Sequence, residues 1–130
     1  MPMDTIGLPF PKGATKLDRA IGKRQARHED TRQLAIWAKA VKERDLWKDR
    51  KTGVRVLRTR QLDPLRGEAH HLVSKDDHAV RYDVRNGVCL SLATHEAVEH
   101  HRLRIEGMAW FRKGGARYID ATFPVIFIRL

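Results

Sequence analysis

The order of apolar and polar positions predicts a run of short elements in the middle of the chain. Apolar residues alternate with polar ones around the pair His70 and His71, which predicts a short strand. The apolar run at positions 88–92 predicts a second strand. From Thr94, an acceptable helix N-cap, the residue types favour or tolerate a helix. The expected order is therefore strand, loop, strand, helix.

Upstream, the sequence predicts a helix with one apolar face and a basic opposite side. Asp30 or Thr31 can cap this helix. Residues 16–27 can form a separate helix, which Gly22 and dense basic charge make marginal, and the prolines and glycines of residues 1–15 predict an extended or disordered arm. The apolar stripe of the capped helix follows the 3.6-residue period and contains Leu34, Trp37, Ala38 and Val41.

Downstream, alternation on both sides of a Gly-Gly pair predicts a β-hairpin over residues 108–119. A further strand is predicted at residues 125–128, after Pro124, and we expect it to continue from the hairpin. The fold class is therefore α+β, with N-terminal helices and a C-terminal hairpin and strands. The expected organisation is a basic arm, partly disordered or helical, over residues 1–29 and a domain over 30–130 with its core at 67–103 and a β extension at 108–129.

Net charge and composition limit the classes of binding partner and the compartment that the sequence favours. The net charge is +10, of which residues 1–60 carry +9 and residues 61–130 carry +1. This asymmetry favours a polyanion, nucleic acid before membrane, although charge alone fits a merely solvated surface about equally well. No apolar run approaches the roughly 20 residues that span a bilayer, and no signal-peptide core is present. The single cysteine, Cys89, is expected to be a small core hydrophobe in a reducing, cytoplasmic compartment.

Three of the seven histidines carry the candidate chemistry. His70 and His71 are consecutive on the first central strand, so their side chains point to opposite faces and cannot easily bind one metal together. One ligand and one base is the simpler division, but the pattern does not say which is which. His95 lies on the following helix with Glu99 four residues later on the same face, whereas His100 is turned about 140° away.

These residues and their flanks resemble the core of the HNH endonucleases, the ββα-metal (His-Me finger) fold, and most of all its small phage and bacterial members. The resemblance rests on three elements in the expected order, with flanking segments that extend it over about residues 30–123. The matching segments are Glu68-Ala69-His70-His71-Leu72-Val73, Asp83-Val84-Arg85-Asn86 and Thr94-His95, flanked by Val41-Lys42-Glu43-Arg44-Asp45 and Tyr118-Ile119-Asp120-Ala121.

The resemblance implies a metal-dependent endonuclease or nickase acting on double-stranded DNA in the cytoplasm of a bacterial or phage-infected cell. His71 would be the general base and Asn86 would tie the loop that orients it. His70 and His95 would hold one divalent ion, Mg²⁺, Mn²⁺, Ni²⁺ or Zn²⁺, with Glu99 or water as a third ligand. A catalytically silent DNA-binding module is the alternative, and an RNA-directed role is a weaker one. The residues expected to contact nucleic acid are Lys16, Arg19, Lys23, Arg24, Arg27 and Arg85, although Arg85 could equally pair with Asp83.

Related HNH proteins often carry two Cys-x-x-Cys pairs that hold a structural zinc. In this chain the corresponding positions are Val54 and Leu57, then Ser91 and Thr94, and none offers a thiolate. We therefore expect no structural zinc. The expectation is that the segment 54–57 is held by apolar packing against the upstream helix or the C-terminal strands, and that Ser91 and Thr94 bond the backbone at the start of the helix.

Overall fold

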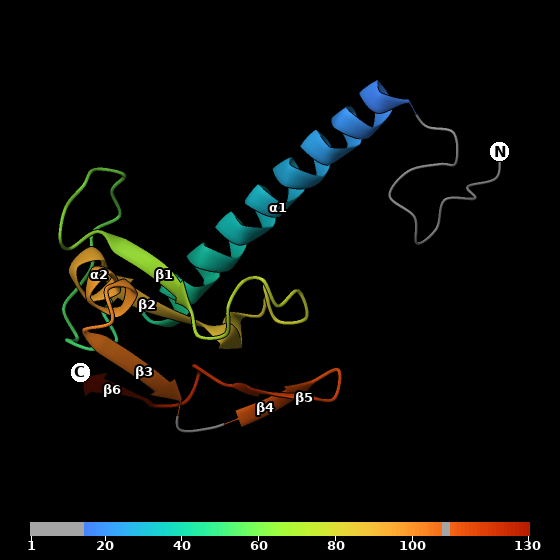
Figure 1. Ribbon diagram of the computed structural model, residues 1–130. Helices are drawn as coiled ribbons and strands as arrows, with labels where there is room; N and C mark the ends of the chain where they lie inside the picture. The colour runs from blue at the N-terminus through green and yellow to red at the C-terminus, as the bar shows by residue number, and fades with distance from the viewer. Residues whose placement is uncertain (1–14, 108–109) are drawn as a thin grey trace. The chain divides into compact units, whose positions relative to one another are not determined.

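The computed structural model describes residues 15–107 and 110–130, and its architecture is α+β, as the pattern predicts (Figure 1). The chain divides into two units, residues 1–33 and 34–130, where the sequence predicts a boundary after residue 29. In chain order the elements are α1 (Lys16–Arg44), β1 (Gly67–His71), the 3-10 turn η1 (Val84–Asn86), β2 (Gly87–Ser91), α2 (Leu92–Glu99), β3 (Leu103–Gly107), β4 (Trp110–Lys113), β5 (Ala116–Ile119) and β6 (Val125–Arg129).

The centre of the second unit is the antiparallel pair β1 and β2, with α2 packed against both strands. In the register of this pair His70 lies opposite Val88 and His71 opposite Gly87. The predicted order of strand, loop, strand and helix is thus found. The predicted N-cap is wrong by three residues, because the hydroxyl of Ser91 accepts the N–H of Thr94 at 3.2 Å and the helix begins at Leu92.

Helix α1 corrects the expectation of two separate N-terminal helices. It runs without a break from Lys16 to Arg44. Its start is capped reciprocally: Asp18 N–H donates to the Thr15 hydroxyl at 3.1 Å, and Thr15 N–H donates to the Asp18 carboxylate at 3.2 Å. Thr31, predicted as a cap, lies inside the helix and donates its hydroxyl to the Arg27 carbonyl at 2.9 Å. Of the apolar stripe, Trp37 and Val41 are the buried members.

The C-terminal strands are arranged differently from the expectation. The β4–β5 hairpin forms as predicted within the described residues, while residues 108 and 109, like the arm at 1–14, lie outside them. Strand β6 does not continue the hairpin. It pairs antiparallel with β3, an element that the sequence analysis missed. An apolar core cluster contains the buried residues Val88, Leu90 and Ala121. Ile105 of β3 and Val125 and Phe127 of β6 pack against this cluster.

The segment 54–57 is held by backbone pairing rather than by the apolar contacts expected of Val54 and Leu57. Both of these side chains are exposed, whereas Val56 is buried and lies against Gly67 at the start of β1. Leu57 N–H donates to the Leu65 carbonyl at 2.7 Å, and Val56 N–H donates to the Trp47 carbonyl at 2.9 Å. The apolar packing expected of Val54 and Leu57 is therefore not found.

Two buried carboxylates connect the segment after α1 to strand β2. Asp45 accepts the N–H of Cys89 at 2.8 Å, and Asp49 accepts the N–H of Ser91 at 2.8 Å. Asp49 also accepts the N–H groups of Lys51 and Thr52 through its other oxygen. Burial alone would raise the pKa of Asp49, but the hydrogen bonds from Thr94, Ser91 and Thr52 outweigh it and lower the pKa below its ordinary value.

Gly87 allows α1 and β2 to approach each other. A Cβ at this position would lie 2.6 Å from Cζ2 of Trp37 and would also collide with the side chain of Val41, and both residues are buried. Gly87→Ala is therefore expected to lower the free energy of unfolding by about 1–3 kcal/mol through overpacking. Chemical denaturation measures the change. An unaltered denaturation midpoint would mean that α1 and β2 do not pack this closely.

Within residues 15–107 and 110–130, no helix combines the length and the apolar character that crossing a bilayer requires.

Candidate functional site

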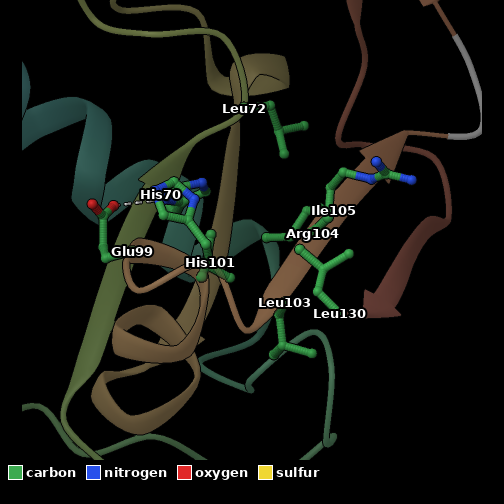
Figure 2. Close-up of a pocket in the computed structure, with 9 residues that line it drawn as sticks. His70, Leu72, Glu99, His101, Leu103, Arg104, Ile105 and Leu130 are labelled. Carbon is green, nitrogen blue, oxygen red and sulfur yellow. Dashed lines mark ion pairs between the residues drawn. The ribbon is translucent and has the colours of Figure 1, made fainter.

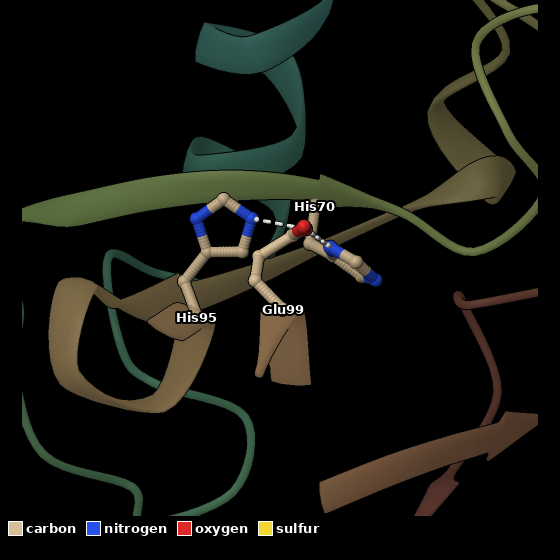
Figure 3. Close-up of side chains that lie close together, drawn as sticks. All are labelled: His70, His95 and Glu99. Atoms are coloured by element: carbon tan, nitrogen blue, oxygen red, sulfur yellow. Dashed lines mark ion pairs between the residues drawn. The ribbon is translucent and has the colours of Figure 1, made fainter. Parts of the chain in front are cut away.

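His70 on β1 and His95 and Glu99 on α2 form one cluster of potential metal ligands (Figure 3). Glu99 Oε1 lies 3.3 Å from Nε2 of His95 and 3.7 Å from Nδ1 of His70, and one ligand atom from each of the three residues lies within 4.8 Å of the others. The two imidazole rings are edge to face, with centroids 5.3 Å apart. Three donors thus converge on one point from two elements.

The donor set fits a divalent cation. Burial lowers the pKa of His70 to about 4, and the neighbouring His95 adds to this shift, so His70 is neutral at physiological pH and its lone pair is available. Two imidazoles and one carboxylate suit several first-row transition metals and zinc. Glu99 is more than half exposed, and the cluster therefore opens to solvent on that side. Among the described residues this is the group that could hold an ion.

His71 lies outside the ligand cluster, as expected for the residue that follows His70 on the strand. Its Nε2 lies 2.9 Å from the carbonyl oxygen of Arg81. A carbonyl only accepts hydrogen bonds, so Nε2 carries the proton and Nδ1 keeps the lone pair. Burial lowers the pKa of His71, although the Arg81 carbonyl opposes the shift. The ring is thus neutral at physiological pH, with Nδ1 ready to accept a proton.

Trp37 of α1 fixes the plane of the His71 ring. The two rings are stacked, with centroids 3.7 Å apart and an interplanar angle of 9°. The indole is itself held, because Trp37 Nε1 donates to the Asp83 carbonyl at 2.9 Å. Trp37 is buried, as expected of a core residue, and it also serves as a wall against which His71 is oriented.

Asn86 is fully buried and ties together the loop between β1 and β2. Its side-chain oxygen accepts the N–H of Val73 at 2.7 Å, and its amide nitrogen donates to the carbonyls of Val73 and Val80 at 3.0 and 3.2 Å. This loop supplies the Arg81 carbonyl that bonds His71. Asn86 therefore ties the loop whose Arg81 carbonyl bonds His71, and its part in orienting a general base stays a prediction.

His71 and the three potential metal ligands lie around the same cavity. A cavity of about 470 Å³ is lined by Ala69, His70, His71, Ser74, Lys75, His95 and Glu99. The ligand cluster, His71 and Lys75 thus line one space. A second cleft of about 370 Å³ has His70 and Glu99 at one edge and Arg104 of β3 at the other (Figure 2). Its remaining walls are largely apolar and include Leu72, Val98, Leu103, Ile105 and Leu130.

Most of the residues predicted to contact nucleic acid lie outside the unit that contains this cleft. Five of them are exposed on the part of α1 that belongs to the first unit, and four of the five follow one another at helical spacing. Their contact with DNA stays a prediction. These residues are Lys16, Arg19, Lys23, Arg24 and Arg27.

Arg85, the sixth residue, has intramolecular partners. Its guanidinium bonds both carboxylate oxygens of Asp83, at 3.1 and 2.8 Å, and lies over the ring of Phe111 at 3.8 Å. The hydrogen bonds of Asp83 raise the pKa of Arg85. Of the two roles that the sequence left open for Arg85, these contacts favour the pairing with Asp83 over a phosphate contact.

Sequence reasoning missed three contributors to the site. Trp37 precedes His71 by 34 positions, and its stacking depends on how α1 crosses the strands. Arg81 contacts His71 through its backbone carbonyl, a group that every residue type has, so the sequence gives no sign of it. Lys75 stood in a polar loop among other charged residues, and nothing in its spacing distinguished it. Glu99, in contrast, was found through its i, i+4 relation to His95.

The description of this site rests on the geometry of the chain itself. Comparisons with models of known protein families, with curated proteins and with solved structures found no match.

Proposed function

We propose that this chain is a metal-dependent DNA endonuclease or nickase of the HNH type, with β1, β2 and α2 as a ββα-metal core. One observation carries the proposal: a single cleft contains a three-donor cation cluster and, on the adjacent residue, an imidazole whose Nδ1 is presented as a base. Hydrolysis of a phosphodiester needs this combination of a proton acceptor and positive charge near the phosphate.

In the proposed reaction His71 is the general base. Its Nδ1 takes a proton from a water molecule, and the resulting nucleophile attacks the phosphorus in line with the leaving oxygen. The Nε2–H remains bonded to the Arg81 carbonyl, so the ring keeps one tautomer as it becomes protonated. The stack on Trp37 prevents the ring from rotating away from the water.

His70, His95 and Glu99 would hold one divalent ion. When bound, the ion supplies positive charge that neutralises the phosphate and stabilises the departing 3′ oxygen. The two histidines belong to different elements, so the packing of α2 on β1 sets the distance between them. Lys75 adds a further positive charge at the same cleft and fits a phosphate oxygen of the substrate.

Duplex DNA is the proposed substrate because of the charge on the chain. The excess of Lys and Arg over Asp and Glu is concentrated before residue 61, and the exposed basic side chains of α1 suit a phosphate backbone. The proposed setting is the cytoplasm of a bacterial or phage-infected cell.

The test is incubation of supercoiled plasmid with the purified chain and Mg²⁺, Mn²⁺, Ni²⁺ or Zn²⁺, with EDTA as the control. Relaxed circles are expected with at least one of these ions and none with EDTA. Removing a ligand should weaken metal binding, so Glu99→Ala is expected to raise the metal concentration for half-maximal nicking about 10- to 100-fold. His100→Ala removes an exposed imidazole next to Glu99 but outside the cluster and should leave that concentration unchanged.

The outcome that overturns the proposal is specific. A chain that binds the plasmid and leaves it supercoiled with all four ions is a catalytically silent DNA-binding module. Equal metal requirements for Glu99→Ala and His100→Ala would instead remove Glu99 from the ligand set.

A further inference from the structure

The β4–β5 hairpin has two chemically different faces. On one face Phe111 and Tyr118, which are opposite each other in the register, are both buried, with ring centroids 5.8 Å apart. They pack with Val80 and Val73 from the loop between β1 and β2. Two aromatic residues therefore anchor the inner face of the hairpin to that loop.

The outer face is exposed and basic. It presents Trp110, Arg112 and Arg117, and Arg112 lies directly opposite Arg117 in the register. Like charges at opposed positions of a strand pair destabilise the pair. No Asp or Glu occurs between residues 110 and 119 to offset this repulsion. In the part of the chain that the structure describes, Arg112 has no ion pair, and Arg117 contacts the Trp110 ring at 4.7 Å.

This ribbon is attached to the loop between β1 and β2, which also contacts the candidate site. The Tyr118 hydroxyl donates to the Asp77 carboxylate at 2.9 Å, and Val80 of the same loop packs against Phe111. The loop also supplies the Arg81 carbonyl that orients His71. The hairpin and the base are thus connected through one short loop within one compact unit.

The tip of the hairpin is narrow. Gly114 and Gly115 adopt positive φ angles of 56° and 85°, which a two-residue turn between twisted strands requires, and they add no side chain to the tip. A two-stranded ribbon is also narrow enough for the major groove of B-DNA, which is about 12 Å wide. The narrow shape of the hairpin and its positive charge therefore both suit duplex DNA.

We propose that the outer face of the β4–β5 hairpin is a second DNA-binding surface, which enters the major groove of duplex DNA beside the cleft. Arg112 and Arg117 contact the phosphates that border the groove, and the repulsion between them is relieved by the bound anions. The inference rests on the proposed function for its substrate, and it adds a surface that positions the duplex relative to His71.

The test is the binding of a short fluorescent DNA duplex in EDTA, measured by anisotropy over a range of salt concentrations. Arg112→Ala/Arg117→Ala is expected to weaken binding about 10- to 100-fold and to reduce the slope of log affinity against log salt by about 2, one phosphate contact for each arginine. The control is Arg102→Ala/Arg129→Ala, which removes the same charge from exposed positions outside the hairpin and should leave most of the affinity and the slope intact.

Equal losses in the two double variants, or no loss in either, would overturn the proposal, because only total charge or no charge would then matter. A duplex RNA probe separates the partners, since its major groove is too deep and narrow for the ribbon. A hairpin-dependent loss as large for RNA as for DNA contradicts the assignment. Thermal unfolding should show no destabilisation of Arg112→Ala, because the substitution removes a repulsion.

The binding test is independent of cleavage. A chain that binds DNA through the hairpin and never nicks plasmid retains this inference and loses the proposed nuclease activity. A chain that nicks plasmid equally well and binds equally tightly without Arg112 and Arg117 retains the activity and loses the inference.

Discussion

Replacement of His71 by alanine is expected to slow plasmid nicking by about 10²- to 10⁴-fold. The reason is the loss of the proposed base, an imidazole that lines the cavity and is held by the Arg81 carbonyl and the Trp37 stack. Metal binding should change little, because the cluster of potential ligands consists of His70, His95 and Glu99 and does not include His71. Nicking rates and metal affinity, measured on the same preparation, separate the two effects.

His78→Ala is the matched control for His71→Ala. His78 is an exposed histidine in the loop between β1 and β2, seven residues after His71, and its removal should leave the nicking rate unchanged. His95→Ala should lower nicking together with metal affinity, which marks it as a ligand rather than the base. Unchanged nicking by folded His71→Ala protein, checked by circular dichroism, would falsify the assignment of the base.

The parts of the site that could be predicted are those that local rules determine. Alternation along a strand separates His70 from His71, and the i, i+4 spacing places Glu99 beside His95. The roles of the two consecutive histidines could not be assigned from that pattern. The proposed assignment rests on contacts across the chain, Glu99 with His70 and Trp37 with His71, which depend on tertiary packing.

The parts of the fold that sequence reasoning missed have the same origin. The start of α1 has a reciprocal cap at Thr15 and Asp18, and the basic stretch over 16–27, expected as a separate and marginal helix, is continuous with the helix that follows it. Strand β3 alternates apolar and charged residues and β6 is almost continuously apolar, but their pairing is non-local and bypasses the intervening hairpin. Local patterns identify strands more readily than they identify strand partners.

Asp49→Ala is expected to lower the free energy of unfolding by about 3–5 kcal/mol, a large fraction of the stability of a domain of this size. The carboxylate is fully buried and accepts three backbone N–H groups, of which that of Ser91 belongs to a buried strand residue. Alanine leaves these donors without their acceptor. Because α2 begins at the next residue, loss of this contact also loosens the helix that carries His95 and Glu99.

Asp63→Ala is the matched control, since Asp63 accepts a single exposed N–H, that of Leu65 at 2.9 Å, and its loss should cost less than about 1 kcal/mol. The contribution of Asp49 should also depend on pH. Its folded pKa is lowered from 3.8, so the contribution is present above that value and disappears as the pH falls through the folded pKa. The difference in stability between wild type and Asp49→Ala should therefore shrink below about pH 4.

A chelator is expected to remove the bound metal with only a small effect on the stability of the fold. If the buried carboxylates of Asp45 and Asp49 and the backbone pairing of the segment 54–57, rather than a structural zinc, hold this region to β2, EDTA should remove an ion at His70 and His95 without unfolding the chain. The expected loss of stability is then only the mass-action term of one bound ion. A tightly bound zinc that persists in His70→Ala/His95→Ala protein, and whose removal unfolds it, would contradict this account. Thermal unfolding before and after EDTA, with metal content by mass spectrometry, decides between the two.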